Sequence, residues 1–205
     1  MASHGLAGVK SRIASAITVF VRGKMRVVQE YSHLDGAEIL KVQHPSIDRE
    51  LYQMIELVQL ECYDAPGDTG AQLSAEHLDR QFRDLLLGGA YAGLREECVG
   101  PVTGDWSPPD GEYRTVEFAK QRVLTAVRFD SYPAVFYDAV KFQHFYSVGR
   151  ADVGVQILPC HALQQRLSLF LACGEQLIYD IENLKPHFPA VPVKVILIDT
   201  DKDTV

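Results

Sequence analysis

The sequence contains few cysteines and no long hydrophobic run. Its four cysteines form no CxxC pair, a pattern that is atypical of zinc sites and of disulfide-rich secreted domains. Nowhere do about eighteen apolar residues follow one another, so we expect no transmembrane helix and no membrane partner. The 205 residues are 47% hydrophobic, which is typical of a globular domain with a single core. We therefore expect a cytoplasmic protein with reduced thiols.

An excess of positive charge is also absent. The net charge of -7 argues against a generally basic protein that binds nucleic acid without specificity. The charges are unevenly spread, however, because residues 114–128 hold four basic residues and one acid, whereas acids concentrate in 48–97 and near the C-terminus. This distribution allows a local DNA-binding surface, although many proteins that never bind DNA share it.

Residues 1–24 differ from the rest, because they contain four basic residues and no acid. Their apolar stretch from Ile13 to Val21 could belong to a targeting peptide, but polar residues interrupt it and no convincing cleavage site follows. We favour an N-terminal extension that is non-native or arises from an upstream start, with the natural start at Met25. The domain proper then covers residues 25–205.

Apolar periodicity predicts an α/β domain. Alternating or continuous apolar runs predict strands over 25–32, 123–129, 153–159 and 193–198. Helical spacing predicts helices from Ile47 to about Cys62, from Ser74 to Leu87 and from Leu163 to Ile181, with Val135–Phe145 helical or buried. We expect a long loop over 100–111. Strands that alternate with helices indicate a mixed sheet.

The segment Val116–Phe129 carries the strongest functional signal. Two strand-like pieces flank a basic turn, with Glu117 on the first and Arg128 on the second. Such hairpins hold the metal-binding acids of many DNA-cutting nucleases. Mg²⁺ takes carboxylate oxygens as ligands, neutralises charge on the scissile phosphate and activates the attacking water. Ala126, however, stands where a second acid would be expected.

This segment and its surroundings resemble the BglII/BstYI family of type II restriction endonucleases. That family has the motif D-x(n)-[D/E]-x-K of the restriction-nuclease fold, with glutamine in place of lysine. In chain order, the matching segments are Met25–Val28, Tyr31–Gly36, Glu117–Val123, Val127–Tyr132, Tyr137–Asp138 and Asp152–Pro159. The resemblance implies a restriction-endonuclease-like mixed central sheet flanked by helices. It also implies a homodimer that cuts palindromic double-stranded DNA around a GATC core with Mg²⁺.

The resemblance assigns a role to each residue of the hairpin. Glu117 matches the family's first metal-binding aspartate, so it is the expected metal ligand. Ala126 matches the glutamate that is the second ligand, and a methyl group cannot bind a cation. Arg128 matches the glutamine. As a permanent cation without an acceptor it cannot act as a general base, but it could clamp a phosphate.

Three further residues are expected near this site. Glu50, on the first predicted helix, matches an acid that the family places close to the metal. Lys120 and Arg122 lie in the basic turn and are candidates for contact with DNA phosphates. Basic residues in turns are, however, usually exposed to solvent without a ligand.

Ala126 has three explanations. It is an engineered inactivation, or a natural loss, or the second acid has moved to Asp130. Asp130 would lie about 13 Å along the strand from Ala126 at roughly 3.3 Å per residue, so we rank relocation last. The accompanying changes at Glu117 and Arg128 favour natural loss.

These observations lead to competing functional hypotheses. The leading one is a type II restriction-endonuclease-like enzyme whose activity is impaired by Ala126 and Arg128. The alternative is a catalytically inactive DNA-binding protein, a pseudoenzyme or regulator that keeps the fold. A third is a nuclease-fold protein that binds another protein.

Overall fold

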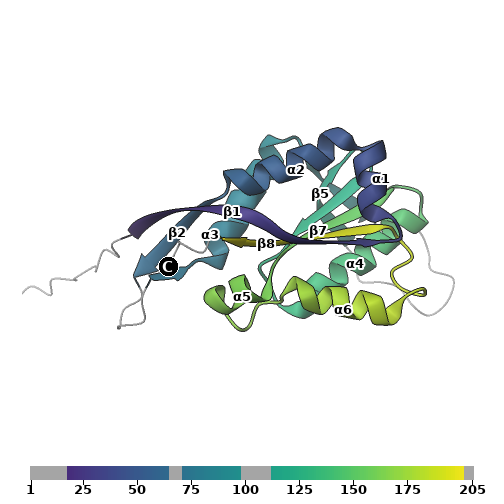
Figure 1. Ribbon diagram of the computed structural model, residues 1–205. Helices are drawn as coiled ribbons and strands as arrows, with labels where there is room; N and C mark the ends of the chain where they lie inside the picture. The colour runs from purple at the N-terminus through teal and green to yellow at the C-terminus, as the bar shows by residue number, and fades with distance from the viewer. Residues whose placement is uncertain (1–17, 65–70, 98–111, 201–205) are drawn as a thin grey trace, which may run out of the picture.

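The computed structural model describes residues 18–64, 71–97 and 112–200. Figure 1 shows their helices and strands. The strands are β1 (Thr18–His33), β2 (Gln59–Asp64), β3 (Ala71–Leu73), β4 (Ala92–Glu97), β5 (Glu112–Lys120), β6 (Val123–Val127), β7 (Val153–Pro159) and β8 (Val193–Thr200). The helices are α1 (Gly36–Gln43), α2 (Pro45–Leu57), α3 (Ala75–Gly88), α4 (Tyr132–Ser147), α5 (His161–Leu167) and α6 (Gly174–Leu184).

The strands form one mixed sheet in the order β3-β2-β1-β8-β7-β6-β5-β4. β6, β7 and β8 run parallel to one another, and the other neighbours are antiparallel. Helices α1 and α2 lie on one side of this sheet, and α4, α5 and α6 lie on the other (Figure 1). The prediction of an α/β domain with a mixed central sheet flanked by helices is therefore confirmed.

The centre of the sheet is the core of the protein. Every residue of β6 and β7 is buried, because helices cover both faces of the parallel strands. At Gly154 of β7 an added Cβ would lie 2.2 Å from the ring of Phe142 in α4. Helix α4 thus packs directly on the backbone of the sheet, which fixes the position of the polar residues that α4 carries.

The predicted helix over 74–87 is confirmed. Helix α3 begins after Ser74, whose side-chain oxygen accepts a hydrogen bond of 3.1 Å from the backbone N–H of His77. This bond satisfies one of the free N–H groups at the start of a helix. The helix ends at Gly88, as the sequence indicates.

The predicted helix from Ile47 to about Cys62 is wrong at its end. Helix α2 ends at Leu57, and the next residues form β2, which pairs antiparallel with β1. Pairing with a distant strand overrides the helical spacing of the apolar residues here. The sheet is therefore wider than the sequence indicates.

The predicted single helix over Leu163–Ile181 is also wrong. Helix α5 ends at Leu167, Ser168 is extended with φ -173° and ψ 138°, and α6 begins at Gly174. Strand β4 was not predicted at all. Its pairing is supplied by β5, which follows it across residues 98–111, outside the described part of the chain.

The predicted boundary between residues 24 and 25 falls inside a strand. β1 begins at Thr18 and continues without a break to His33. Residues 1–17, the rest of the predicted extension, and the predicted loop over 100–111 lie outside the described residues. The assignment of residues 1–24 to a non-native or upstream-start extension stays a prediction.

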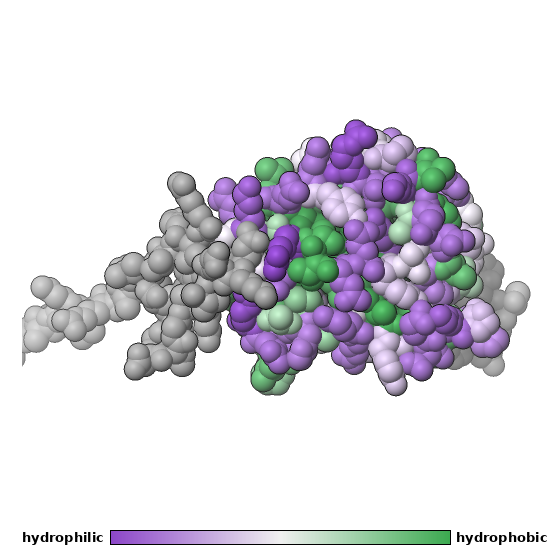
Figure 2. Space-filling view, viewed as in Figure 1, coloured by the Kyte–Doolittle hydropathy of each residue, from purple (hydrophilic) through white to green (hydrophobic). Residues whose placement is uncertain are grey.

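The surface seen from the same side as Figure 1 is mostly hydrophilic, with hydrophobic residues in small separate groups (Figure 2). None of the described helices is both long enough and apolar enough to cross a bilayer. The cytoplasmic location stays a prediction.

Candidate functional site

The hairpin predicted around the basic turn is formed by β5 and β6. Its turn consists of Gln121 and Arg122, which both have positive φ, 47° and 68°. Two left-handed residues match the right-handed twist of the flanking strands, so the turn is tight. The ladder has three pairs, from Lys120 with Val123 to Phe118 with Thr125. Glu117 and Ala126 are the next residues on the two strands, where the ladder ends.

A bulge in β5 lies at or next to Glu117. Ala119 pairs with Ala92 and Val116 pairs with Leu94, so three steps along β5 face two steps along β4. The extra residue falls at Glu117 or Phe118, and such bulges redirect side chains locally. Both side chains meet Arg83 of α3, which lies 3.1 Å from the Glu117 carboxylate and 5.8 Å from the centre of the Phe118 ring.

Glu117 and Arg128 lie close together in the structure. Nη1 of Arg128 lies 3.9 Å from Oε1 of Glu117, while Nη2 of Arg83 donates to Oε2 at 3.1 Å. The Glu117 carboxylate is therefore paired with guanidinium groups on both of its oxygens.

Arg128 is held mainly by Asp138, a residue of α4. Its Nε and Nη2 donate to the two carboxylate oxygens of Asp138 at 2.6 and 3.1 Å. Lys141, one helical turn later, donates to Oδ1 of Asp138 at 2.6 Å. The hydrogen bonds to Asp138 raise the pKa of Arg128 above its usual value, against the opposing effect of burial. Like any arginine in a protein, Arg128 stays charged, and Asp138 compensates its burial.

Asp79 of α3 lies at the edge of this group. Its Oδ2 is 3.9 Å from Nη2 of Arg83. Burial raises the pKa of Asp79, and the neighbouring Glu117 and Asp130 raise it further, whereas Arg83 and Arg128 oppose the shift. Asp79 is a more distant counter-ion of Arg83 than Glu117, at 3.9 Å against 3.1 Å.

The arrangement does not fit the Mg²⁺ that the resemblance implies. Mg²⁺ needs carboxylate oxygens that are free to face the cation. Glu117 already binds two arginines, Ala126 offers a methyl group, and Asp138 is bound by Arg128 and Lys141. Within residues 18–64, 71–97 and 112–200 no group of three or more His, Cys, Asp or Glu side chains could hold a metal ion. Relocation of the acid to Asp130 gains no support, since Oδ1 of Asp130 accepts from the backbone N–H of Ser131 at 2.6 Å.

Glu50 and Lys120 form a separate pair. Nζ of Lys120 donates to both oxygens of Glu50, at 2.9 and 2.7 Å, and to the carbonyl oxygen of Gly89 at 2.6 Å. In the described part of the chain, no hydrogen bond or ion pair joins this pair to Glu117. The structure therefore joins α2 to β5 through Glu50, and all three donors of Lys120 are used.

Arg122 fastens the turn of the hairpin to the start of β7. Its Nε and Nη2 donate to Oδ1 of Asp152 at 2.9 and 2.7 Å, and its Nη1 donates to the carbonyl of Gly149 at 2.7 Å. The Arg122 hydrogen bonds lower the pKa of Asp152. The predicted DNA contacts of Lys120 and Arg122 stay predictions.

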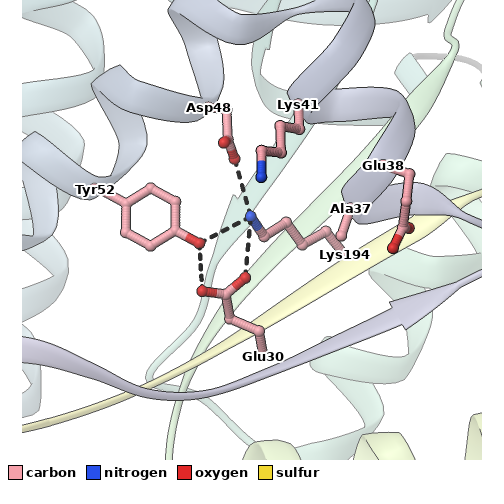
Figure 3. Close-up of a pocket in the computed structure, with 7 residues that line it drawn as sticks. All are labelled: Glu30, Ala37, Glu38, Lys41, Asp48, Tyr52 and Lys194. Atoms are coloured by element: carbon pink, nitrogen blue, oxygen red, sulfur yellow. Dashed lines mark hydrogen bonds and ion pairs between the residues drawn. The ribbon is translucent and has the colours of Figure 1, made fainter.

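A second polar cluster surrounds Lys194 of β8, in a hollow of about 450 Å³. Nζ of Lys194 lies 2.9 Å from Asp48, 2.9 Å from the Tyr52 hydroxyl and 3.2 Å from Glu30, so its three donors meet three oxygens (Figure 3). Burial lowers the pKa of Lys194, but the bonds to Tyr52 and Asp48 raise it more, above the usual value. This cluster ties α2 to the sheet and leaves no donor of Lys194 for a ligand.

Sequence reasoning identified Glu117, Ala126 and Arg128 as neighbours but missed Arg83 and Asp138 as their partners. Asp138 lies in a segment that carries the family resemblance, which was the available signal. Arg83 had no signal, because it reaches Glu117 from a helix 34 residues earlier in the chain.

The fold has known counterparts. The chain is 14% identical to restriction endonuclease BglII complexed with a DNA 16-mer, with a TM-score of 0.58 over 85% of this chain and 75% of that chain. Free BglII is 16% identical, with a TM-score of 0.56 over 85% of this chain and 78% of that chain. At such identities the likeness shows the fold alone. No curated protein sequence is significantly similar to the chain.

The family itself is shown by the sequence match. The family model described as restriction endonuclease BglII/BglIII matches residues 28–198, which include every residue of the Glu117 and Arg128 cluster. The expected resemblance is thereby confirmed. The chain belongs to the restriction endonuclease BglII/BglIII family.

Proposed function

We propose that this protein binds double-stranded DNA but does not hydrolyse it through Mg²⁺ at the Glu117 site. The observation that carries the proposal is the pairing of the Glu117 carboxylate with Arg83 and Arg128, next to Ala126. Hydrolysis of a phosphodiester needs a cation that activates water and stabilises charge on the phosphate. Arginine can supply charge but cannot lower the pKa of a bound water or accept its proton.

Support for DNA as the ligand comes from the family and the fold. Restriction endonuclease BglII, which shares the fold, has been crystallised with a DNA 16-mer. We propose double-stranded DNA as the ligand of this chain too, and a palindrome around GATC is the first sequence to test. A homodimer is part of the proposal, because a two-fold palindrome is read by a two-fold protein.

A binding and cleavage assay tests the proposal. The purified protein is mixed with DNA that contains a GATC palindrome, in Mg²⁺ and at low salt, where electrostatic DNA binding is strongest. We expect a retarded complex and intact DNA after prolonged incubation. Cleavage by the unmodified protein that is lost in Glu117→Ala would refute the absence of hydrolysis. Failure to bind any duplex at low salt would refute DNA binding.

A double variant tests whether Ala126 and Arg128 account for the proposed absence of hydrolysis. Ala126→Glu alone adds a carboxylate beside an arginine-bound Glu117, so it should not create a metal site. Ala126→Glu with Arg128→Gln restores both residues that the family resemblance implies and removes one of the competing cations. Mg²⁺-dependent cleavage by the double variant alone would locate the loss at these two positions.

A further inference from the structure

Two arginines from different parts of the fold converge on one carboxylate. Arg83 comes from α3 and Arg128 follows β6, and their nearest nitrogens lie 3.1 and 3.9 Å from the two oxygens of Glu117. The side chains of Arg83 and Glu117 are 45% and 36% exposed, so solvent reaches the point where the three groups meet. A ligand in solution can therefore reach this point too.

The guanidinium of Arg128 is oriented in advance. Asp138, only 3% exposed, accepts hydrogen bonds from Nε and Nη2 of Arg128 and is itself held by a hydrogen bond from Lys141. The remaining amino group, Nη1, is directed toward Glu117, and at 3.9 Å it is too far for a hydrogen bond. Among the described residues, Nη1 has no acceptor within hydrogen-bond distance. An arginine whose position is already fixed loses little side-chain entropy when it binds a ligand.

The charges of this group favour an anion only when Glu117 is displaced. Arg83, Arg128 and Lys141 carry three positive charges, and Glu117, Asp138 and Asp79 carry three negative ones, so the six side chains have a formal charge of zero. Asp79 is counted because its Oδ2 lies 3.9 Å from Nη2 of Arg83. If Glu117 turns away, Asp138 still pairs with Arg128 and Asp79 still lies 3.9 Å from Arg83, but one positive charge of the group is no longer matched. A carboxylate and a phosphate both accept two guanidinium hydrogen bonds, so one can replace the other.

We propose that Arg83 and Arg128 bind one phosphate of the DNA backbone and that Glu117 occupies their site when DNA is absent. The inference rests on the proposed DNA binding and adds its contact point. The guanidinium groups supply at this point the positive charge for which the family's chemistry uses a divalent cation. Binding of DNA by this protein is accordingly independent of Mg²⁺. Glu117 competes with the DNA phosphate for the two arginines and does not bind a metal ion that would help to hold the DNA.

The test measures duplex binding over a range of salt concentrations, in EDTA and in Mg²⁺. We expect equal affinity in the two buffers at equal ionic strength. Arg83→Gln should weaken binding about tenfold, as expected for loss of a hydrogen bond between charged groups. It should also reduce the slope of log affinity against log salt by about one for each phosphate that the variant no longer neutralises. Glu117→Gln should strengthen binding about threefold or more, because it removes a negative charge beside the phosphate.

Arg80→Gln is the matched control. Arg80 lies one turn before Arg83 on α3, is 62% exposed and pairs only with Glu76 among the described residues. The substitution Arg80→Gln removes the same charge from the same helix, but away from Glu117. It should therefore leave the DNA affinity and the salt slope close to those of the parent. Arg128→Lys keeps a charge beside Asp138 but lacks the planar fork, so it should bind DNA more weakly than the parent and should also be less stable, because the second hydrogen bond to Asp138 is lost.

The outcomes separate the inference from the proposed function. DNA binding that needs Mg²⁺ would overturn the inference and leave DNA binding intact. Binding that Arg83→Gln and Glu117→Gln leave unchanged would do the same. Absence of binding by the parent at low salt would overturn both.

Discussion

Replacing Asp138 with asparagine should destabilise the protein by about 3 kcal/mol. The Asp138 side chain is 3% exposed, and it neutralises Arg128 and Lys141, which are 19% and 11% exposed. Removing one partner of a buried ion pair costs about 3–5 kcal/mol, because the remaining charge stays buried without compensation. The lower end applies because Glu117 remains within 3.9 Å of Arg128.

Urea and thermal unfolding followed by circular dichroism measure this loss. For a domain of this size, a loss of about 3 kcal/mol corresponds to a fall in Tm of roughly 6–12 °C. The control is Glu76→Gln, in an exposed pair with Arg80, where we expect a change within about 0.5 kcal/mol. A loss below about 1 kcal/mol for Asp138→Asn would show that the Arg128 pair is solvated, contrary to the packing described above.

A double-mutant cycle separates the pair from its surroundings. Arg128→Gln removes one of the cations that Asp138→Asn leaves without its partner. The double variant should therefore be more stable than the sum of the two single losses predicts, by about 1–3 kcal/mol. Additive losses would mean that Asp138 stabilises α4 mainly through Lys141.

Two further predictions concern the hairpin and the packing of α1. The pKa of Asp152 is lowered by Arg122, so this carboxylate adds stability above its unfolded pKa of 3.8 and loses it as pH falls through the lower folded value. In Asp152→Asn, urea unfolding between about pH 5 and pH 2 should depend less on pH than in the parent. The same pH dependence in parent and variant would contradict a stabilising role of the Arg122–Asp152 pair. An added Cβ at Gly36 would lie 2.5 Å from the Val193 backbone, so Gly36→Ala should cost about 1–3 kcal/mol in thermal unfolding. Gly88→Ala, with no atom within 4 Å, should change stability by less than about 1 kcal/mol, and equal losses at both sites would refute the close approach.

The elements that could be predicted from sequence have a local physical signal. Helix α3 has a capping serine and a glycine end, and the β5–β6 hairpin has two apolar runs around a turn. β2 lacks such a signal, because Gln59–Asp64 becomes a strand through pairing with β1, some forty residues earlier in the chain. The break between α5 and α6 was missed because apolar spacing continues across it.

The site was predictable only as far as the family motif reaches. Glu117, Ala126 and Arg128 follow from alignment with the motif, whereas their electrostatic state depends on Arg83 and Asp138. These partners come from α3 and α4, so their convergence depends on tertiary packing. Apolar periodicity describes one helix or strand at a time, so it cannot predict which side chains of different elements meet.

The length of β1 has a practical consequence for shortened forms of the protein. The four pairs that define the register between β1 and β2 involve Thr18, Val19, Phe20 and Lys24. A chain that begins at Met25 would keep the pairing of β1 with β8 but would lack all four of these pairs. β2 and β3 would then have no anchor on the sheet, and β1 would become an open edge, able to pair with another molecule. Aggregation of such a truncated protein would reflect the missing strand segment and would not indicate an unstable core.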